Sequence, residues 1–237
     1  MMRHICVFLA YQNIDHIKLS FDSLYLESID YFIVENYSEN SDLIKQYFLD
    51  KKIKGYIQFE KNISATAIDI FINDFYSLLC EYDIITITDG DLYVYDIKSA
   101  FDEIINNLML PNIGISSISL FQDNNYISKN RVVGIDNYIN KQKTNTIGIP
   151  IFTNNGNYLT TFKKQDIGNL KQIHYIDSII YNHFLTLNKK SVATSKNLAY
   201  HLTWDLYFDG NSYYEWKKNV ITHIWNNKEK CNYNRII

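Results

Sequence analysis

The segment Ile84-Ile85-Thr86-Ile87-Thr88-Asp89-Gly90-Asp91 decides how the sequence is interpreted. Its first five residues are all β-branched, a composition typical of a short strand buried inside a sheet. Two acidic residues separated by one glycine follow directly. In open α/β sheets ligands bind beyond the carboxyl ends of the strands, so a binding site is expected where this strand ends.

Upstream of this segment, short β-rich runs alternate with longer segments whose apolar residues have helical spacing. That alternation predicts an α/β fold with a mostly parallel central sheet and helices on both faces. The expected elements are strands at 5–10, 31–35, 53–59 and 84–88, with helices around 17–24, 43–49 and 65–80.

Downstream, the pattern is less regular and indicates a mixed extension of the sheet. The expected elements there are helices near 97–108, 177–187 and 213–225, with β-like segments at 113–120, 147–153 and 191–194. A chain of 237 residues with 46% hydrophobic residues can bury one sizeable core, so a single domain spanning 1–237 is expected.

Composition narrows the function classes. The net charge of -3 provides no basic field for nucleic acid, so a nucleic-acid partner is not expected. The three cysteines, Cys6, Cys80 and Cys231, form no disulfide, zinc or redox motif, which favours a reducing cytoplasm. No run approaches the roughly 20 apolar residues that span a bilayer, so membrane contact is expected to be peripheral at most, at the inner face.

The two acidic residues suit a divalent cation. In an extended segment, residues two apart point the same way, so Asp89 and Asp91 are expected to face one ligand together. Mg²⁺ or Mn²⁺ prefers oxygen ligands and often takes only one or two carboxylates beside substrate phosphates. Gly90 lets the backbone approach closely. The sequence therefore predicts that Asp89 and Asp91 hold a metal ion and a diphosphate.

With this motif, the sequence resembles the nucleotide-sugar glycosyltransferases of the GT-A (Rossmann-like) fold, particularly the family 2 type. The likeness also includes Glu35-Asn36-Tyr37-Ser38, where the family has Asp-Asn-x-Ser and where Tyr37 replaces a common Gly. It implies a nucleotide-binding half at 1–93 and an acceptor-binding half at 94–237. The donor-binding residues that it implies are Ala10, Tyr11, Glu35, Asn36, Ser38, Asn62 and Asp89.

The resemblance also suggests a catalytic base and a third metal ligand. Asp177 precedes an expected helix where the family has its catalytic acidic residue, although Asp at a helix start is also a common N-cap. Asp166 and Asp205 are reserve candidates. His201 resembles the C-terminal histidine that completes the metal site in several GT-A enzymes. The aromatic stretch 204–225 is interpreted as packing, acceptor contact or membrane docking.

The expected function is metal-dependent transfer of a sugar from a nucleoside diphosphate, with uridine as the base, to a hydroxyl of a glycan or lipid-linked glycan, with inversion. This implies polysaccharide biosynthesis in the cytoplasm. Two alternatives remain open: a non-catalytic GT-A-like binding subunit and a sugar-phosphate nucleotidyltransferase. The second lacks the Gly-rich phosphate loop after the first strand, because that place reads Ala10-Tyr11-Gln12-Asn13.

Overall fold

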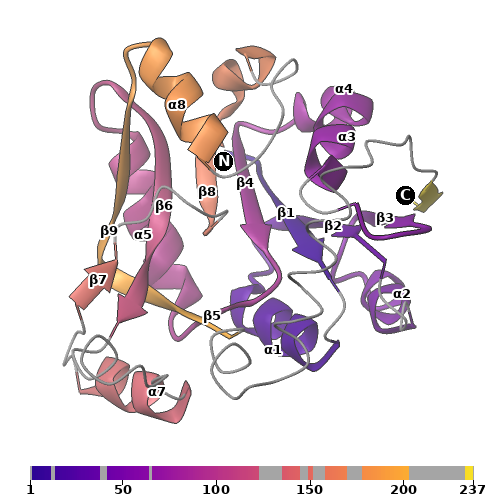
Figure 1. The fold of residues 1–237 in the computed structure, drawn as a ribbon, viewed down its shortest axis with the longest axis horizontal. Helices are drawn as coiled ribbons and strands as arrows, with labels where there is room; N and C mark the ends of the chain where they lie inside the picture. Colours follow the sequence, from indigo (N-terminus) through magenta and orange to yellow (C-terminus); the bar gives the residue numbers. More distant parts are fainter. Residues whose placement is uncertain are drawn as a thin grey trace.

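A mixed sheet forms the centre of the computed structural model, in the order β10-β3-β2-β1-β4-β8-β6-β9-β5 with β7 beside β6 (Figure 1). The structure describes residues 2–11, 14–37, 42–63, 66–122, 135–144, 149–151, 158–169, 178–202 and 233–236. The strands are β1 (His4–Ala10), β2 (Asp30–Glu35), β3 (Gly55–Phe59), β4 (Ile84–Asp89), β5 (Leu92–Val94), β6 (Ile113–Gln122), β7 (Ile149–Ile151), β8 (Thr160–Lys163), β9 (Lys190–His201) and β10 (Tyr233–Ile236). The helices are α1 (Ile14–Leu24), α2 (Asp42–Leu49), α3 (Thr66–Asp74), α4 (Tyr76–Leu79), α5 (Ile97–Leu108), α7 (Ile135–Lys143) and α8 (Ser178–Thr186), with a 3-10 helix η1 (Lys164–Asn169).

The first four strands form the parallel part of the sheet, as their alternation with helices predicts. β1 pairs in parallel with β2 and with β4, and β2 pairs in parallel with β3. The register places Ala10 opposite Glu35 and Leu9 opposite Asp89, so these strands end in one row. We call this row the carboxyl edge of the sheet.

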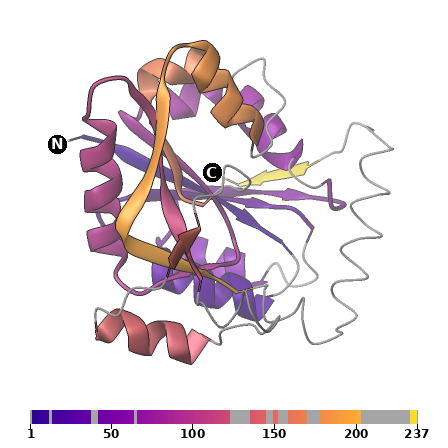
Figure 2. The same cartoon turned by 60° about the vertical axis from the view of Figure 1, so that its left-hand side comes forward.

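Helices cover both faces of the sheet, and each face has its own apolar core. Figures 1 and 2 show α3, α4 and α8 on one side and α1 and α2 on the other. On the first side, α3, α4 and α8 pack against β-strand residues such as Val7 and Ile87; on the second, α1, α2 and α5 pack against residues such as Phe8 and Ile33. Alternating side chains of one strand therefore serve opposite cores, as expected for strands buried on both faces.

The second half differs from the sequence-based expectation in several elements. β6 and β9 pair in parallel, whereas β8, β7 and β5 join by antiparallel pairing, so the extension is mixed as expected. Three strands, β5, β8 and β10, were not predicted, because strands of three or four residues are too short for a periodic signal. The helix α7 was not predicted either, because its sequence is mostly polar. The expected helix at 65–80 is instead two helices that meet at Phe75, whose ring stacks on Phe71 4.9 Å away and contacts Phe32.

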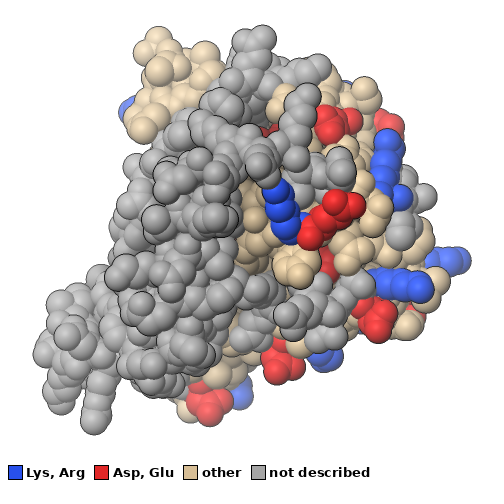
Figure 3. Space-filling view, turned by 45° about the vertical axis from the view of Figure 1, so that its right-hand side comes forward, with Lys and Arg blue, Asp and Glu red and all other residues tan. Residues whose placement is uncertain are grey.

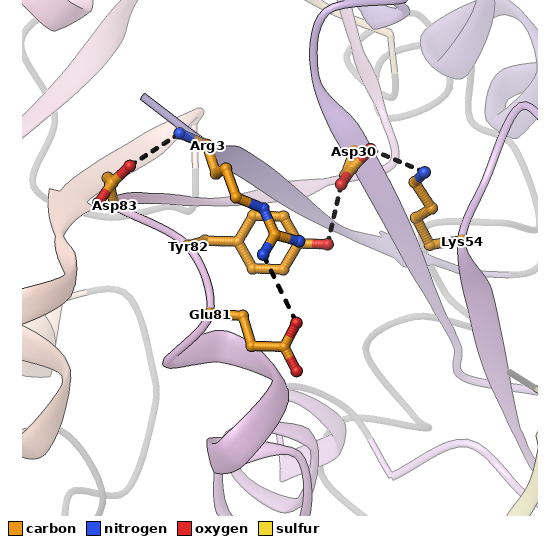
Figure 4. Close-up of polar contacts among 6 residues, drawn as sticks. All are labelled: Arg3, Asp30, Lys54, Glu81, Tyr82 and Asp83. Carbon is orange, nitrogen blue, oxygen red and sulfur yellow. Dashed lines mark hydrogen bonds and ion pairs between the residues drawn. The ribbon is translucent and has the colours of Figure 1, made fainter. Parts of the chain in front are cut away.

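The opposite, amino edge of the parallel strands is joined by a network of polar contacts (Figure 4). The guanidinium of Arg3 lies over the Tyr82 ring, 4.5 Å from its centroid, and 3.6 Å from a carboxylate oxygen of Glu81. The Tyr82 hydroxyl donates to Asp30 at 2.9 Å, and Asp30 also pairs with Lys54. Residues that precede or begin β1, β2, β3 and β4 are thereby linked.

The two ends of the sheet are formed by β10 and β5. β10 pairs antiparallel with β3, and its Tyr233 hydroxyl donates to Asp74 at 2.6 Å. At the other end, β5 has β9 on one side and the helix α1 on the other. Within the described ranges, no helix combines the length and the apolar character that crossing a bilayer requires.

A carboxylate on α5 fixes a bend of β9, which yields a stability prediction. Glu103 accepts hydrogen bonds from the backbone N–H groups of Ser195, Lys196 and Asn197 and from the Asn197 side chain, at 2.6 to 3.3 Å. Partial burial acts to raise the pKa of Glu103, but these donors outweigh burial and hold the pKa below its usual 4.5.

We expect Glu103→Gln to lower the thermal midpoint at pH 7 by about 2–4 °C, because a partly exposed set of charge-assisted bonds contributes on the order of 1 kcal/mol. Since the folded-state pKa is depressed, this contribution is present above pH 4.5 and is lost as the pH falls through the folded-state value. Between pH 5 and pH 3, the thermal midpoint should therefore fall more steeply with decreasing pH for the wild type than for the variant. Equal slopes would contradict the assignment.

Candidate functional site

The carboxyl edge contains the point where the order of the strands reverses. From β1 the chain builds β2 and β3 on one side and then crosses to place β4 on the other side. Ligands of open α/β sheets bind in the crevice at such a reversal. The residues that border it are Ala10 at the end of β1 and Asp89 at the end of β4.

Gly90 packs directly against the end of β1. A Cβ atom at this position would lie 2.6 Å from the carbonyl oxygen of Leu9 and 3.0 Å from the Phe8 ring. Any residue with a side chain would therefore push the ends of β4 and β1 apart. The close approach that the structure shows at Gly90 is made to β1.

The chain turns at Gly90 and Asp91 instead of continuing as an extended strand. The rule that residues two apart point the same way applies only to extended backbone, so it does not describe Asp89 and Asp91 here. The turn carries Asp91 toward β9. Asp89 remains the last residue of β4, opposite Leu9.

Asp91 and His201 form a pair at the carboxyl edge. Leu92 pairs with His201 across β5 and β9, and the Leu202 N–H donates to the Asp91 carbonyl at 2.8 Å. This ladder brings Nε2 of His201 within 3.6 Å of Oδ2 of Asp91, with 9% and 20% of the two side chains exposed. The edge of Tyr158 packs on the His201 ring, with the centroids 5.8 Å apart. A carboxylate and an imidazole far apart in sequence are thus adjacent.

Two serines of α1 hold β5 in place, and the sequence analysis missed them. Ser20 accepts a hydrogen bond from the Leu92 N–H at 3.3 Å, and Ser23 accepts one from the Val94 N–H at 3.2 Å. Alternate N–H groups of a strand point to opposite sides, so these two face away from β9. Serines in a helix with an otherwise apolar face were the available signal.

The residues expected to bind the nucleoside are connected to one another. The Asn36 N–H donates to the Ala10 carbonyl at 2.9 Å, and the Asn36 side chain donates to Asn62 at 2.9 Å. The Asn36 side-chain oxygen accepts from the Ile63 N–H at 2.8 Å. Asn36 therefore ties the ends of β1 and β2 to the turn after β3, and Tyr11 follows Ala10 at the same edge, partly buried.

Glu35 is fully buried at the end of β2. It lies close enough to Tyr56 to act on that hydroxyl: burial raises the pKa of Tyr56, and the negative charge of Glu35 raises it further. Because the Glu35 side chain has no exposed surface, it would act on a bound molecule only through the neighbouring groups that it orients. Asn36 is buried in the same way.

Several expected site residues lie outside the described part of the chain, namely Ser38, Asp177, Asp205 and the stretch 204–225. The reserve base Asp166 is described, and it lies away from the carboxyl edge. It follows β8, whose Lys163 pairs with Ile84 at the start of β4, and its carboxylate is buried in an ion pair with Lys189. Asp166 is therefore not a candidate for the base at this site.

The metal-binding potential of the edge rests on a small set of side chains. Among the residues that the structure describes, no three or more His, Cys, Asp or Glu side chains form a group that could hold a metal ion. Of the described residues, the edge presents Asp91 with His201, and Asp89 nearby in sequence. On the face seen in Figure 3, acidic and basic side chains of the described residues are interspersed and neither sign gathers into a patch.

Comparison with known proteins gives relatives and a fold. No model of a known protein family matches the chain. Protein L142 of Acanthamoeba polyphaga mimivirus is 30% identical over 96% of the chain and 49% of its own length. Protein L138 of the same virus is 33% identical over 96% of the chain and 27% of its own length. The chain thus spans at most about half the length of these two relatives, whose names state no activity.

Several solved structures that are similar to this chain are glycosyltransferases. The mannosyltransferase PcManGT from Pyrobaculum calidifontis, in complex with GDP-Man and Mn²⁺, matches 94% of this chain and 62% of its own at 13% identity, with a TM-score of 0.60. TarS of S. aureus matches 97% of this chain and 41% of its own at 13% identity, with a TM-score of 0.52. Glucosyl-3-phosphoglycerate synthase from Mycobacterium tuberculosis, in complex with Mn²⁺ and UDP, matches 84% of this chain and 72% of its own at 12% identity, with a TM-score of 0.50. The chain therefore has the GT-A fold of nucleotide-sugar glycosyltransferases.

The contact of Gly90 with β1 makes a stability prediction. We expect Gly90→Ala to lower the free energy of unfolding by about 1–3 kcal/mol, because a Cβ atom that meets a backbone carbonyl forces the strand ends apart. Urea denaturation would measure the loss. Gly55→Ala, at the start of β3 and away from this edge, is the control for the generic effect of replacing glycine. A Gly90→Ala variant as stable as the wild type would show that the two strand ends separate without cost.

Proposed function

We propose that the chain is a metal-dependent glycosyltransferase that moves a sugar from a nucleoside diphosphate to a hydroxyl group of a glycan or glycolipid. Uridine is the proposed base. Residues 1–93 bind the donor and residues 94–237 bind the acceptor, within one domain. The observation that carries the proposal is the Asp91–His201 pair next to Asp89, at the strand reversal of a GT-A fold.

The donor set fits a hard divalent cation. Two ligands of one cation lie about 3 to 4 Å apart when each bond is about 2.1 Å, and the Asp91–His201 separation is 3.6 Å. Mg²⁺ keeps only one or two protein ligands when substrate phosphates supply others, so a three-residue cluster is not required. An imidazole beside a carboxylate favours Mn²⁺ over Mg²⁺. Asp91 and His201 would hold the cation, and Asp89 would contact the cation or the donor.

The chemistry is a displacement at the sugar carbon that the diphosphate leaves. When bound, the cation supplies positive charge that stabilises the leaving nucleoside diphosphate. Asp91 and His201 orient the diphosphate at the carboxyl edge, while Gly90 keeps their turn against β1. Asp177 is the proposed base that takes the proton of the acceptor hydroxyl, which makes the transfer inverting. Ala10, Tyr11, Glu35, Asn36, Ser38 and Asn62 form or support the donor side.

The metal site predicts the behaviour of an Asp91 variant. We expect UDP-sugars with Mn²⁺ to raise the thermal midpoint of the wild type by about 5–10 °C at 100 times the dissociation constant, by mass action. Asp91→Asn should abolish the Mn²⁺-dependent part of this shift and leave the midpoint without ligand nearly unchanged, since the side chain lies at a turn on the edge. Thermal-shift titration with and without Mn²⁺ measures both quantities.

The matched control is Asp102→Asn, which removes an exposed carboxylate of α5 that pairs only weakly with Lys98, 3.7 Å away. It should keep the full Mn²⁺-dependent shift. A wild type that shows no Mn²⁺-dependent stabilisation by any UDP-sugar or by GDP-mannose would refute the proposed function. An unchanged shift in Asp91→Asn would refute only the metal assignment.

Turnover separates an enzyme from a binding subunit. An active transferase should release nucleoside diphosphate from a UDP-sugar slowly in the presence of Mn²⁺, whereas a binding subunit would release none.

Asp177→Asn should keep donor binding and lose transfer to an acceptor, because only proton removal is affected. Donor binding by calorimetry and transfer by product detection test the two halves of this statement. Retained transfer would exclude Asp177 as the base.

A further inference from the structure

Tyr37 has a combination of backbone and surface properties that the donor-site residues described so far do not share. It follows Asn36 directly at the end of β2 and adopts a φ angle of 62°, in the left-handed region that favours glycine. Its side chain is 44% exposed. A large aromatic residue is thus held in an unfavourable backbone conformation while its ring remains largely in contact with solvent.

The neighbours of Tyr37 explain how this conformation is maintained. Asn36 is buried and bonded to Ala10, Asn62 and Ile63, so the backbone that enters Tyr37 is fixed on three sides. Glu35 is fully buried as well. Tyr37 is therefore the first side chain at the end of β2 with surface to offer a bound molecule. Backbone strain of this kind persists where the surrounding structure enforces it, and it gathers at ligand sites.

The distance from the proposed metal site to Tyr37 fits the distance between the diphosphate and the base of a sugar-nucleotide donor. Neighbouring strands lie about 4.8 Å apart, so the end of β2 is about 10 Å from the end of β4, with β1 between them. A diphosphate at the end of β4 would place its ribose over β1 and its base over β2. A nucleobase has two flat faces, and stacking on an aromatic ring is the contact that suits them.

We propose that Tyr37 is a donor-binding residue whose ring stacks on the nucleobase of the donor, whether that base is uracil or guanine. This inference rests on the proposed function and names the side chain that forms one wall of its nucleoside site. The ring, rather than the hydroxyl, makes the contact. A glycine would fit the backbone better at this position, so the tyrosine is there for its side chain.

The test compares substitutions that separate the ring from the backbone. Tyr37→Gly removes both the ring and the strain, Tyr37→Asn removes the ring but tolerates positive φ, and Tyr37→Phe keeps the ring. Calorimetry with UDP and Mn²⁺, and with GDP in parallel, should show binding weakened about 5- to 100-fold in the Gly and Asn variants and within about twofold of wild type in Phe. Pyrophosphate with Mn²⁺, which has no base, should bind all four proteins equally.

Lys51→Gly is the matched control. Lys51 also has a positive φ, 58°, but it lies just after α2, ahead of the start of β3 and away from the carboxyl edge. Both glycine variants should keep a thermal midpoint within about 2 °C of wild type or above it, and only Tyr37→Gly should lose nucleotide affinity.

Each outcome decides a different question. UDP affinity that is equal in wild type and Tyr37→Gly overturns the role of Tyr37 and leaves the proposed function standing. Equal loss of UDP and pyrophosphate in Tyr37→Gly also overturns it, because the residue would then support the site and not the base. A wild type that binds neither UDP nor GDP with Mn²⁺ overturns the proposed function together with this inference.

Discussion

The close packing of Gly90 on the carbonyl of Leu9 is the constraint on which the rest of the site depends. It fixes the ends of β4 and β1 at van der Waals distance, where the strand order reverses. The turn that follows leads to β5, which pairs with β9. The position of Asp91 beside His201 is the result of that pairing. The interior of a protein is packed too tightly for such a backbone contact to shift gradually.

The carboxyl edge combines two kinds of support. On the side of β5, hydrogen bonds from backbone N–H groups reach Ser20 and Ser23 on α1, and the ladder with β9 completes the strand. On the side of β2, Asn36 joins three segments through its backbone N–H and the two polar ends of its side-chain amide. Both supports use polar side chains that are themselves buried or partly buried, which rigidifies a polar site in the way a fully satisfied network does. The partly buried Asp91 and the exposed Tyr37 are carried on these supports.

Much of the first half of the fold could be predicted from the sequence, because each parallel strand is a continuous apolar run and each helix has its own periodic face. A helix was likewise predicted at 97–108, where the structure has α5, and the structure adds that Asp96 is its N-cap. The strand β5 could not be predicted, since three residues carry no period and its pairing with β9 joins positions about a hundred residues apart. The Asp91–His201 pair depends on that pairing. The sequence suggested both residues through a family resemblance, but it contained nothing that placed them within 4 Å of each other. The turn at Gly90 and Asp91 was not predicted for a local reason: a glycine between two acidic residues permits a turn as readily as an extended strand.

The strand β10 has a consequence for solubility. Without a partner, β3 would present a row of open N–H and C=O groups at the border of the sheet, which is the kind of surface on which chains add to one another. Residues 233–236 pair with that row. Two side-chain contacts hold them there: the Arg235 guanidinium lies over the Phe75 ring, and the Tyr233 hydroxyl donates a hydrogen bond to Asp74. Residues more than 170 positions away from β3 thus replace it as the border strand, and a very short edge strand such as β10 limits pairing with other chains. A fragment that ended before them would keep its site residues and still be prone to polymerise edge to edge.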